Sequence, residues 1–194
     1  MKRSITLVLL SAMIFAFVIG PLAIHASATS QEVSAIALNE LGLMNGVGTN
    51  SDGSIDFALS STANRQTATT MLVRLLGKET AAAAGSWSLP FSDFDSWARL
   101  YVGYAYKNGL VNGISSSSFG GTNTITAQQY ITMILRVLGY SDDKSGGSVD
   151  FSYAGACEFA ESIGLTDGSY TNSTTSFKRG DIAVISFNAL GLKM

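Results

Sequence analysis

The sequence has little of what most enzyme and metal sites require. Its 194 residues include one cysteine and one histidine, so neither an internal disulfide nor a cysteine–histidine metal cluster can form. The histidine, His25, falls in the N-terminal leader described below, which leaves the rest of the chain without an imidazole for general-base catalysis. The net charge is −2, so the basic excess typical of nucleic-acid-binding proteins is missing. We therefore predict no metal, no cofactor and no nucleic-acid partner.

Apolar residues, by contrast, are abundant. They make up 46% of the chain, which is enough for a packed core and argues against disorder. The lone cysteine, Cys157, lies in a stretch with apolar spacing. We predict that it is a small buried hydrophobe rather than a reactive thiol.

A long apolar run occurs only at the N-terminus. Lys2 and Arg3 precede an apolar stretch at 5–19, and small residues follow up to Ala28. This order predicts a secretory signal peptide at 1–28, cleaved after Ala28. The alternative is a retained membrane anchor, because the apolar stretch could just reach across a bilayer. Cleavage would leave 166 of the 194 residues, secreted, with a net charge of −4 and no further membrane contact.

Three later segments share one pattern. Each runs from a first-turn residue to a Leu-Gly pair, at 65–77, 127–139 and 179–191, and each follows a Gly-Leu pair. Repeats of this kind indicate stacked structural units. We predict three units, at 29–80, 88–140 and 148–194, and interpret the segments at 78–90 and 141–148 as linkers between them.

The middle segment shows the helical pattern best. Tyr130, Ile134 and Leu138 recur on one helical face, Thr126 and Gln129 form a capping box, and a glycine ends the run. Each unit is therefore predicted to be helix, polar loop, helix. No unit could bury its apolar face alone, so an all-α fold of about six helices is expected, in which three helix-loop-helix prongs pack together. Arg74 and Arg136, at equal positions in two units, are predicted to brace neighbouring units.

The middle unit also carries a set of short motifs. It reads Phe-Ser-Asp at 91–93, Trp-Ala at 97–98, Gly-Leu-Val-Asn-Gly at 109–113 and Ile-Thr-Ala-Gln-Gln at 125–129. This combination resembles the S-layer homology family, whose repeat contains Phe-x-Asp, Trp-Ala, Gly-Ile/Leu-x-x-Gly and Ile-Thr-Arg-Ala-Glu. The likeness is strong in the middle unit and looser in the other two.

The resemblance implies a fold, a location and a ligand. The expected fold is a pseudo-threefold spindle of three repeats. The expected ligand is secondary cell-wall polysaccharide, often pyruvylated, bound in grooves between the repeats. Such arrays hold surface proteins on Gram-positive-type cell walls without a covalent bond, beside other surface-layer proteins. A secreted, non-enzymatic wall anchor follows as the expectation.

Five residues match the family's ligand positions: Arg65, Arg179, Asp93, Trp97 and Gly113. An arginine fork suits a ketal carboxylate, and a first-turn position would add free backbone N–H groups and the helix dipole. A tryptophan offers a flat face to a sugar, a carboxylate can accept from hydroxyl groups, and a glycine permits close approach.

The chain also departs from the family pattern. Ala127 replaces the arginine in the middle unit, and Tyr153 stands near the tryptophan position in the third. Trp97 is also interpretable as a core residue, and Asp93 as the cap of the helix that follows it. The alternative function is a secreted protein-interaction or self-assembly module that has lost glycan binding.

Overall fold

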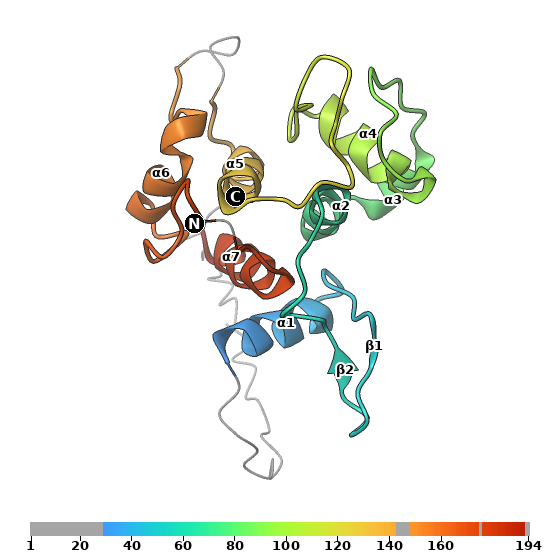
Figure 1. Cartoon of the computed structure of the whole chain (residues 1–194), viewed down its shortest axis with the longest axis vertical. Helices are drawn as coiled ribbons and strands as arrows, with labels where there is room; N and C mark the ends of the chain where they lie inside the picture. The colour runs from blue at the N-terminus through green and yellow to red at the C-terminus, as the bar shows by residue number, and fades with distance from the viewer. Residues whose placement is uncertain (1–28, 143–147, 175, 193–194) are drawn as a thin grey trace, which may run out of the picture.

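The computed structural model describes residues 29–142, 148–174 and 176–192, and the predicted signal peptide lies outside this part. Helices dominate it (Figure 1). They are α1 (Ser30–Glu40), α2 (Arg65–Leu75), α3 (Glu79–Ala84), α4 (Arg99–Lys107), α5 (Ala127–Val137), α6 (Ala156–Ser162) and α7 (Arg179–Gly191), with short 3-10 helices η1 (Ser96–Ala98) and η3 (Tyr153–Gly155). The strands of the described part are β1 (Gly48–Thr49) and β2 (Ile55–Asp56), paired antiparallel. The mostly helical fold confirms the expected class.

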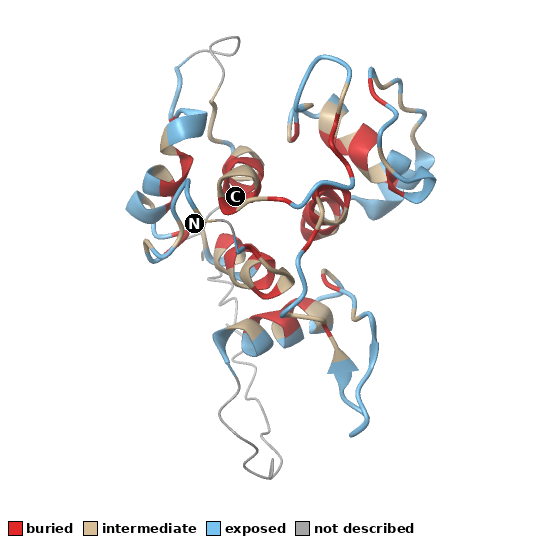
Figure 2. Cartoon of the chain, viewed as in Figure 1, coloured by how far each residue is buried: buried red, intermediate tan, exposed pale blue. Residues whose placement is uncertain are grey.

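Three helices form the centre of the molecule. Helices α2, α5 and α7 contact one another pairwise, and Figure 2 shows that most of their surface is buried or partly buried. Each begins at the residue predicted from the repeat. Caps explain two of these starts: Asn64 accepts from the Thr67 N–H, while Thr126 and Gln129 form the expected box. Fully buried side chains such as Leu72, Ile131 and Ile185 fill the space between them.

The outer helices pair across the predicted units. Helix α1 packs on α7, α4 packs on α2, and α6 packs on α5. The two main helices of one unit are not packed against each other anywhere in the described structure. The expectation that each unit forms its own prong is therefore wrong. Long loops carry the chain away from each outer helix before the next central helix begins. Helices α4 and α6 therefore pair with the central helix of the preceding unit, whereas α1 of the first unit pairs with α7 of the third.

The segment expected to be a linker at 78–90 is structured. It contains α3, which packs on α4. The ring of Trp87 meets Tyr104 edge-on at 5.8 Å, and its Nε1 donates to the Ala82 carbonyl at 2.9 Å. Glu79 also forms a salt bridge with Arg74 at 3.0 Å. Within the described ranges, none of the helices combines the length and apolar character needed to cross a membrane.

Candidate functional site

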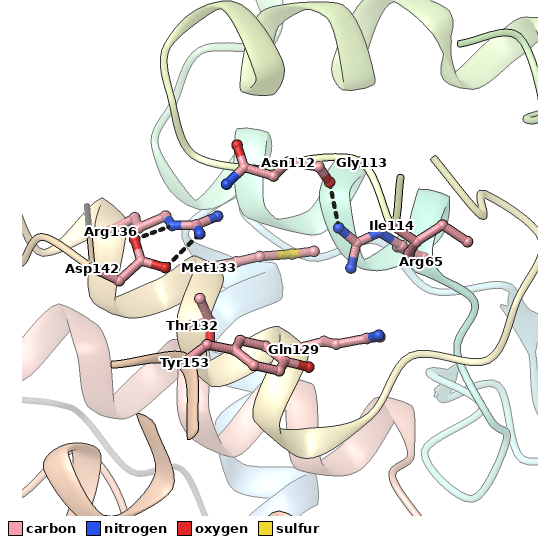
Figure 3. Close-up of a pocket in the computed structure, with 10 residues that line it drawn as sticks. All are labelled: Arg65, Asn112, Gly113, Ile114, Gln129, Thr132, Met133, Arg136, Asp142 and Tyr153. Carbon is pink, nitrogen blue, oxygen red and sulfur yellow. Dashed lines mark hydrogen bonds and ion pairs between the residues drawn. The ribbon is translucent and has the colours of Figure 1, made fainter. Parts of the chain in front are cut away.

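A groove of about 470 Å³ opens between units one, two and three. Its walls come from the start of α2, the loop after α4, one face of α5 and η3 (Figure 3). The lining residues are Arg65, Asn112, Gly113, Ile114, Gln129, Thr132, Met133, Arg136, Asp142 and Tyr153. Two of the five predicted ligand residues, Arg65 and Gly113, therefore lie in the same groove.

Arg65 is a buried cation at one end of this groove. Only 7% of its surface is exposed. Its Nη2 donates to the Asn112 carbonyl at 2.6 Å, and the guanidinium carbon lies 4.9 Å from the centre of the Phe119 ring. Its Nε has no hydrogen-bond partner among the residues that the structure describes. Burial lowers the pKa of Arg65 to about 10, so the group still carries its charge at neutral pH.

No carboxylate of the described residues lies within salt-bridge distance of Arg65. A buried charge without a counter-ion is costly, and a ligand carboxylate would relieve that cost. This end of the groove is therefore suited to an anion.

The opposite end of the groove holds a charge that is already paired. Arg136 binds Asp142 through two nearly parallel contacts, Nε to Oδ1 at 2.9 Å and Nη2 to Oδ2 at 2.6 Å. Asn112 contacts both arginines. Its main-chain carbonyl accepts from Arg65, and its side-chain oxygen accepts from Arg136 Nη2 at 3.2 Å when the side-chain amide is oriented so that both its oxygen and its nitrogen form hydrogen bonds. Met133 lies between the two ends (Figure 3). The groove therefore has one unpaired cationic end and one neutral polar end.

Tyr153 supplies the aromatic surface of the groove. It is 48% exposed, and its carbonyl accepts from the Gln128 side chain at 2.8 Å, which ties η3 to α5. An amphipathic ring in this position can cover the apolar face of a sugar while its hydroxyl stays hydrated.

Arg179 occupies the position in α7 that Arg65 occupies in α2, but its donors are used. Its Nε donates to the Phe57 carbonyl at 2.9 Å, and its Nη2 donates to the Asn45 carbonyl at 3.2 Å. Its Nη1 lies 3.7 Å from the sulfur of Met71. Arg179 does not line the groove that contains Arg65. The two arginines are thus equivalent in sequence and different in their bonding.

Asp93 holds a loop together. Its carboxylate accepts from the Ser118 hydroxyl and from the Phe119 and Gly120 N–H groups, the last two at 2.7 Å. Desolvation by the neighbouring loop opposes the charged form, but these hydrogen bonds outweigh it and lower the pKa of Asp93 to about 2. The capping interpretation is wrong, because the residue before η1 is Asp95. Asp93 lies outside the groove.

Trp97 and Gly113 also differ from expectation. Trp97 is 48% exposed and its Nε1 donates to Asp95 at 3.2 Å, so it is not a core residue, and it does not line the groove.

Gly113 does line the groove, yet a side chain at this position would collide with the carbonyl oxygens of Ser115 and Ser118. Close packing of the loop on itself therefore requires this glycine, whatever the ligand.

The first-turn N–H groups of α2 and α7 are also used within the protein. Arg65 and Gln66 donate to the carbonyls of Asn123 and Gly121, both at 2.9 Å. Arg179 donates in the same way to the Ser61 carbonyl at 2.9 Å. The expectation that these groups are free for a ligand is wrong, and the guanidinium of Arg65 has to carry the anion site.

Sequence reasoning assigned Arg136 to bracing and gave Asn112, Met133 and Asp142 no role. The contacts of Arg136 with Asp142 and Leu110 agree with bracing, but the residue also forms one end of the groove. The spacing of Arg136 from Gln129 and Met133, at i, i+4 and i+7 on one helical face, was a signal that could have placed it there.

Comparisons with known proteins agree with this architecture. A family model for the S-layer homology domain matches residues 90–131. The chain is 32% identical over 165 residues to a "Cell surface protein" of Thermoanaerobacter kivui, covering 83% of this chain and 20% of that protein. It is 30% identical over 156 residues to a "Surface layer protein" of Brevibacillus choshinensis, covering 75% and 13%. A "Middle cell wall protein" of Brevibacillus brevis is 29% identical over 204 aligned positions, covering 98% and 18%. The chain spans a fifth or less of the length of each of these relatives.

Proposed function

Because this chain contains an S-layer homology domain at residues 90–131, we propose that it attaches protein to the outside of a Gram-positive-type cell by binding an anionic wall polysaccharide. In this proposal the three units form one pseudo-threefold spindle. The ligand is secondary cell-wall polysaccharide, and its negative group is a carboxylate such as a pyruvate ketal. The names of the relatives support a role at the cell surface.

The observation that carries the proposal is the uncompensated charge of Arg65. Within the described residues only its Nη2 donates a hydrogen bond, and its buried Nε donates none. Because Nε is buried, a ligand carboxylate would accept from the N–H groups of the guanidinium nitrogens Nη1 and Nη2. Each charge-assisted bond contributes about 1.5–3 kcal/mol. The bound carboxylate would also neutralise a cation that has no counter-ion in the described part of the chain.

The remainder of the groove suits the neutral part of a glycan. Tyr153 offers an aromatic face, and Gln129 and Thr132 add polar groups along α5. The paired Arg136 and Asp142 can exchange hydrogen bonds with sugar hydroxyls without demanding a second charge. A chain of sugars with its carboxylate at Arg65 would therefore fit along the groove.

The structure favours one anion site over three. Ala127 provides no cation in α5, and the donors of Arg179 are occupied. Binding through one groove lacks the gain that several linked sites would give. We therefore propose monovalent attachment, with Arg179 as a structural residue.

Co-sedimentation of the purified protein with Gram-positive-type cell walls tests this proposal. The walls would be used before and after acid extraction of their secondary polysaccharide. We expect binding to intact walls, loss of binding after extraction, and loss of binding in Arg65→Ala. Arg99→Ala is the matched control, because it removes the same charge from an exposed site whose hydrogen bond goes to the Trp87 carbonyl. Arg99→Ala should sediment as the unaltered protein does.

Circular dichroism would confirm that each variant is folded. Arg179→Ala should lower the melting temperature and retain wall binding at temperatures where it stays folded. Normal sedimentation of folded Arg65→Ala would contradict the proposed site. Failure of the unaltered protein to bind intact walls would instead favour a protein-interaction module.

A further inference from the structure

A second cleft, of about 810 Å³, lies between α1, the β1–β2 hairpin and the start of α7. It shares no lining residue with the groove that contains Arg65. Residues 57–59 form part of its wall, and Ile36 and Ile55 stand beside them, 47% and 45% exposed. Apolar side chains that remain exposed around a cleft of this size indicate a binding surface.

Residues 57–59 have the same backbone role in unit one that residues 119–121 have in unit two. The carbonyl of Leu59 accepts from Gly180 at 3.0 Å, as that of Gly121 accepts from Gln66 at 2.9 Å. Both loops also turn through a positive φ, at +48° in Ala58 and at +69° in Gly120. The two loops can therefore be compared residue by residue.

In unit two the chain itself fills the space beside this loop. The rings of Phe91 and Phe94 lie 5.6 and 6.1 Å from the ring of Phe119. The main-chain oxygen of Asp93 accepts from the Gly121 N–H at 3.1 Å. Residues 91–95 thus lie against the loop, outside any helix or strand, and help to bury its aromatic residue.

In unit one the described structure places no such segment there. Phe57 takes the position of Phe119 and contributes an edge to the cleft, with 7% of its surface exposed, while Ile36 and Ile55 supply most of the exposed apolar surface. The Leu59 N–H, which corresponds to the bonded Gly121 N–H, has no acceptor among the residues that the structure describes. The cleft therefore presents exposed apolar side chains at Ile36 and Ile55, and a main-chain donor at the position that binds the Asp93 carbonyl in unit two.

We propose that an extended segment of another polypeptide docks in this cleft, as residues 91–95 dock in unit two. A bulky apolar side chain of the segment packs on Ile36 and Ile55 and against the exposed edge of Phe57. One of its main-chain carbonyls accepts from the Leu59 N–H. Such addition of an extended peptide uses main-chain bonds for affinity and a side-chain pocket for selectivity.

The charges of the cleft define the partner further. Asp56 accepts from the Ala58 N–H at 2.7 Å, which is the role that Asp93 has for Gly120, so the partner need not supply a carboxylate. Glu32, Glu40 and Asp181 also line the cleft, against the single cation of Lys178. Complementary charge selects partners and speeds their encounter. The partner segment is therefore neutral or basic and differs from residues 91–95 in this respect.

Fluorescence anisotropy with labelled synthetic peptides tests the proposal on the purified protein. The probe is the sequence of residues 89–95 with Asp93→Ser and Asp95→Lys. It should bind at least about tenfold more tightly than the unaltered acidic sequence at low salt, and this ratio should shrink as salt screens the charges. A probe that also carries Phe91→Ala should bind about tenfold more weakly, because it loses the buried ring.

Variants of the protein locate the binding site. Ile36→Ser should weaken probe binding, whereas Leu100→Ser, at an exposed position of α4, should leave it unchanged. Arg65→Ala should bind the probe as tightly as the unaltered protein does, because Arg65 does not line this cleft. Probe binding and wall binding are therefore tested separately. Absence of probe binding, or equal binding with and without the ring of Phe91, would overturn the proposal.

Two further outcomes would assign the cleft to a different occupant and so overturn the proposal. Self-association that Ile36→Ser abolishes would identify a second copy of this chain. Binding only by protein that lacks residues 1–28 would show that the chain's own preceding residues compete for the cleft.

Discussion

Replacement of Asp93 by asparagine should destabilise the protein through a loop that lies far from it in sequence. The carboxylate accepts from three donors at residues 118–120. An asparagine side chain at this position would offer one oxygen and turn an NH2 group toward donors. The change therefore breaks at least one charge-assisted bond while leaving the side-chain volume nearly unchanged.

The size of the effect follows from the pKa. Burial raises the pKa of Asp93, the three hydrogen bonds lower it more, and the value falls from 3.8 to about 2. At about 1.36 kcal/mol per pKa unit the full shift would correspond to roughly 2.4 kcal/mol. Because the residue is exposed, solvent screening reduces this to about 1 kcal/mol. For a protein of this size the melting temperature should fall by about 2–4 °C at pH 7.

The effect should depend on pH in a defined direction. The folded-state pKa of Asp93 is depressed, so its stabilising contribution is complete above 3.8, the unfolded value, and is lost as pH falls through about 2. Thermal unfolding of both proteins by circular dichroism should therefore show a difference at pH 5–7 that narrows toward pH 2. Asp167→Asn is the control, because Asp167 accepts only from Ser169, two residues away, and should have a smaller effect. A difference that is absent at pH 7, or constant down to pH 2, would refute this reasoning.

Two further substitutions test the packing. Tyr130→Phe removes the buried hydroxyl that lies 2.7 Å from the Ser186 hydroxyl. The free energy of unfolding, measured in urea, should fall by about 1–2 kcal/mol with an unchanged m-value. An unaltered urea midpoint would contradict this hydrogen bond. Gly113→Ala brings a methyl group against the Ser115 and Ser118 carbonyls and should lower the free energy of unfolding by about 1–3 kcal/mol. Gly48→Ala is the control, because a methyl group there meets nothing within 4 Å. Equal melting temperatures of the two variants would contradict the expected collision.

The starts of the central helices were predictable from sequence because their signals are local. Thr126 and Gln129 form a cap within four residues, and the apolar spacing of α5 repeats every turn. The same logic placed Arg65 and Arg179 at the first positions of α2 and α7. These features depend on neighbouring residues alone.

The features that were missed depend on residues far apart in the chain. Asp93 looked like a helix cap, but its partners lie 25–27 residues further on. Arg65 and Arg179 looked alike, yet the Phe57 carbonyl is placed to accept from Arg179 Nε, while Arg65 Nε has no partner. The pairing of outer helices across units has the same origin, since a repeat does not show which copy its helices will contact.

The pairing of α1 with α7 has a consequence for how the domain assembles. Gln31 donates to Asp181 at 3.1 Å across 150 positions of the chain, so the first helix of the described structure finds its partner only after nearly all of that structure exists. Contacts this distant form late, because the intervening chain must first be ordered. Until then the buried face of α1, which includes Ala35 and Leu38, has nothing to cover it. The three units are consequently not expected to unfold one after another, as the repeats of an open, linear repeat protein can. Because α1 packs on α7, and α7 contacts both α2 and α5, loss of one central helix exposes surface in every prong, and the whole should unfold as a single cooperative body.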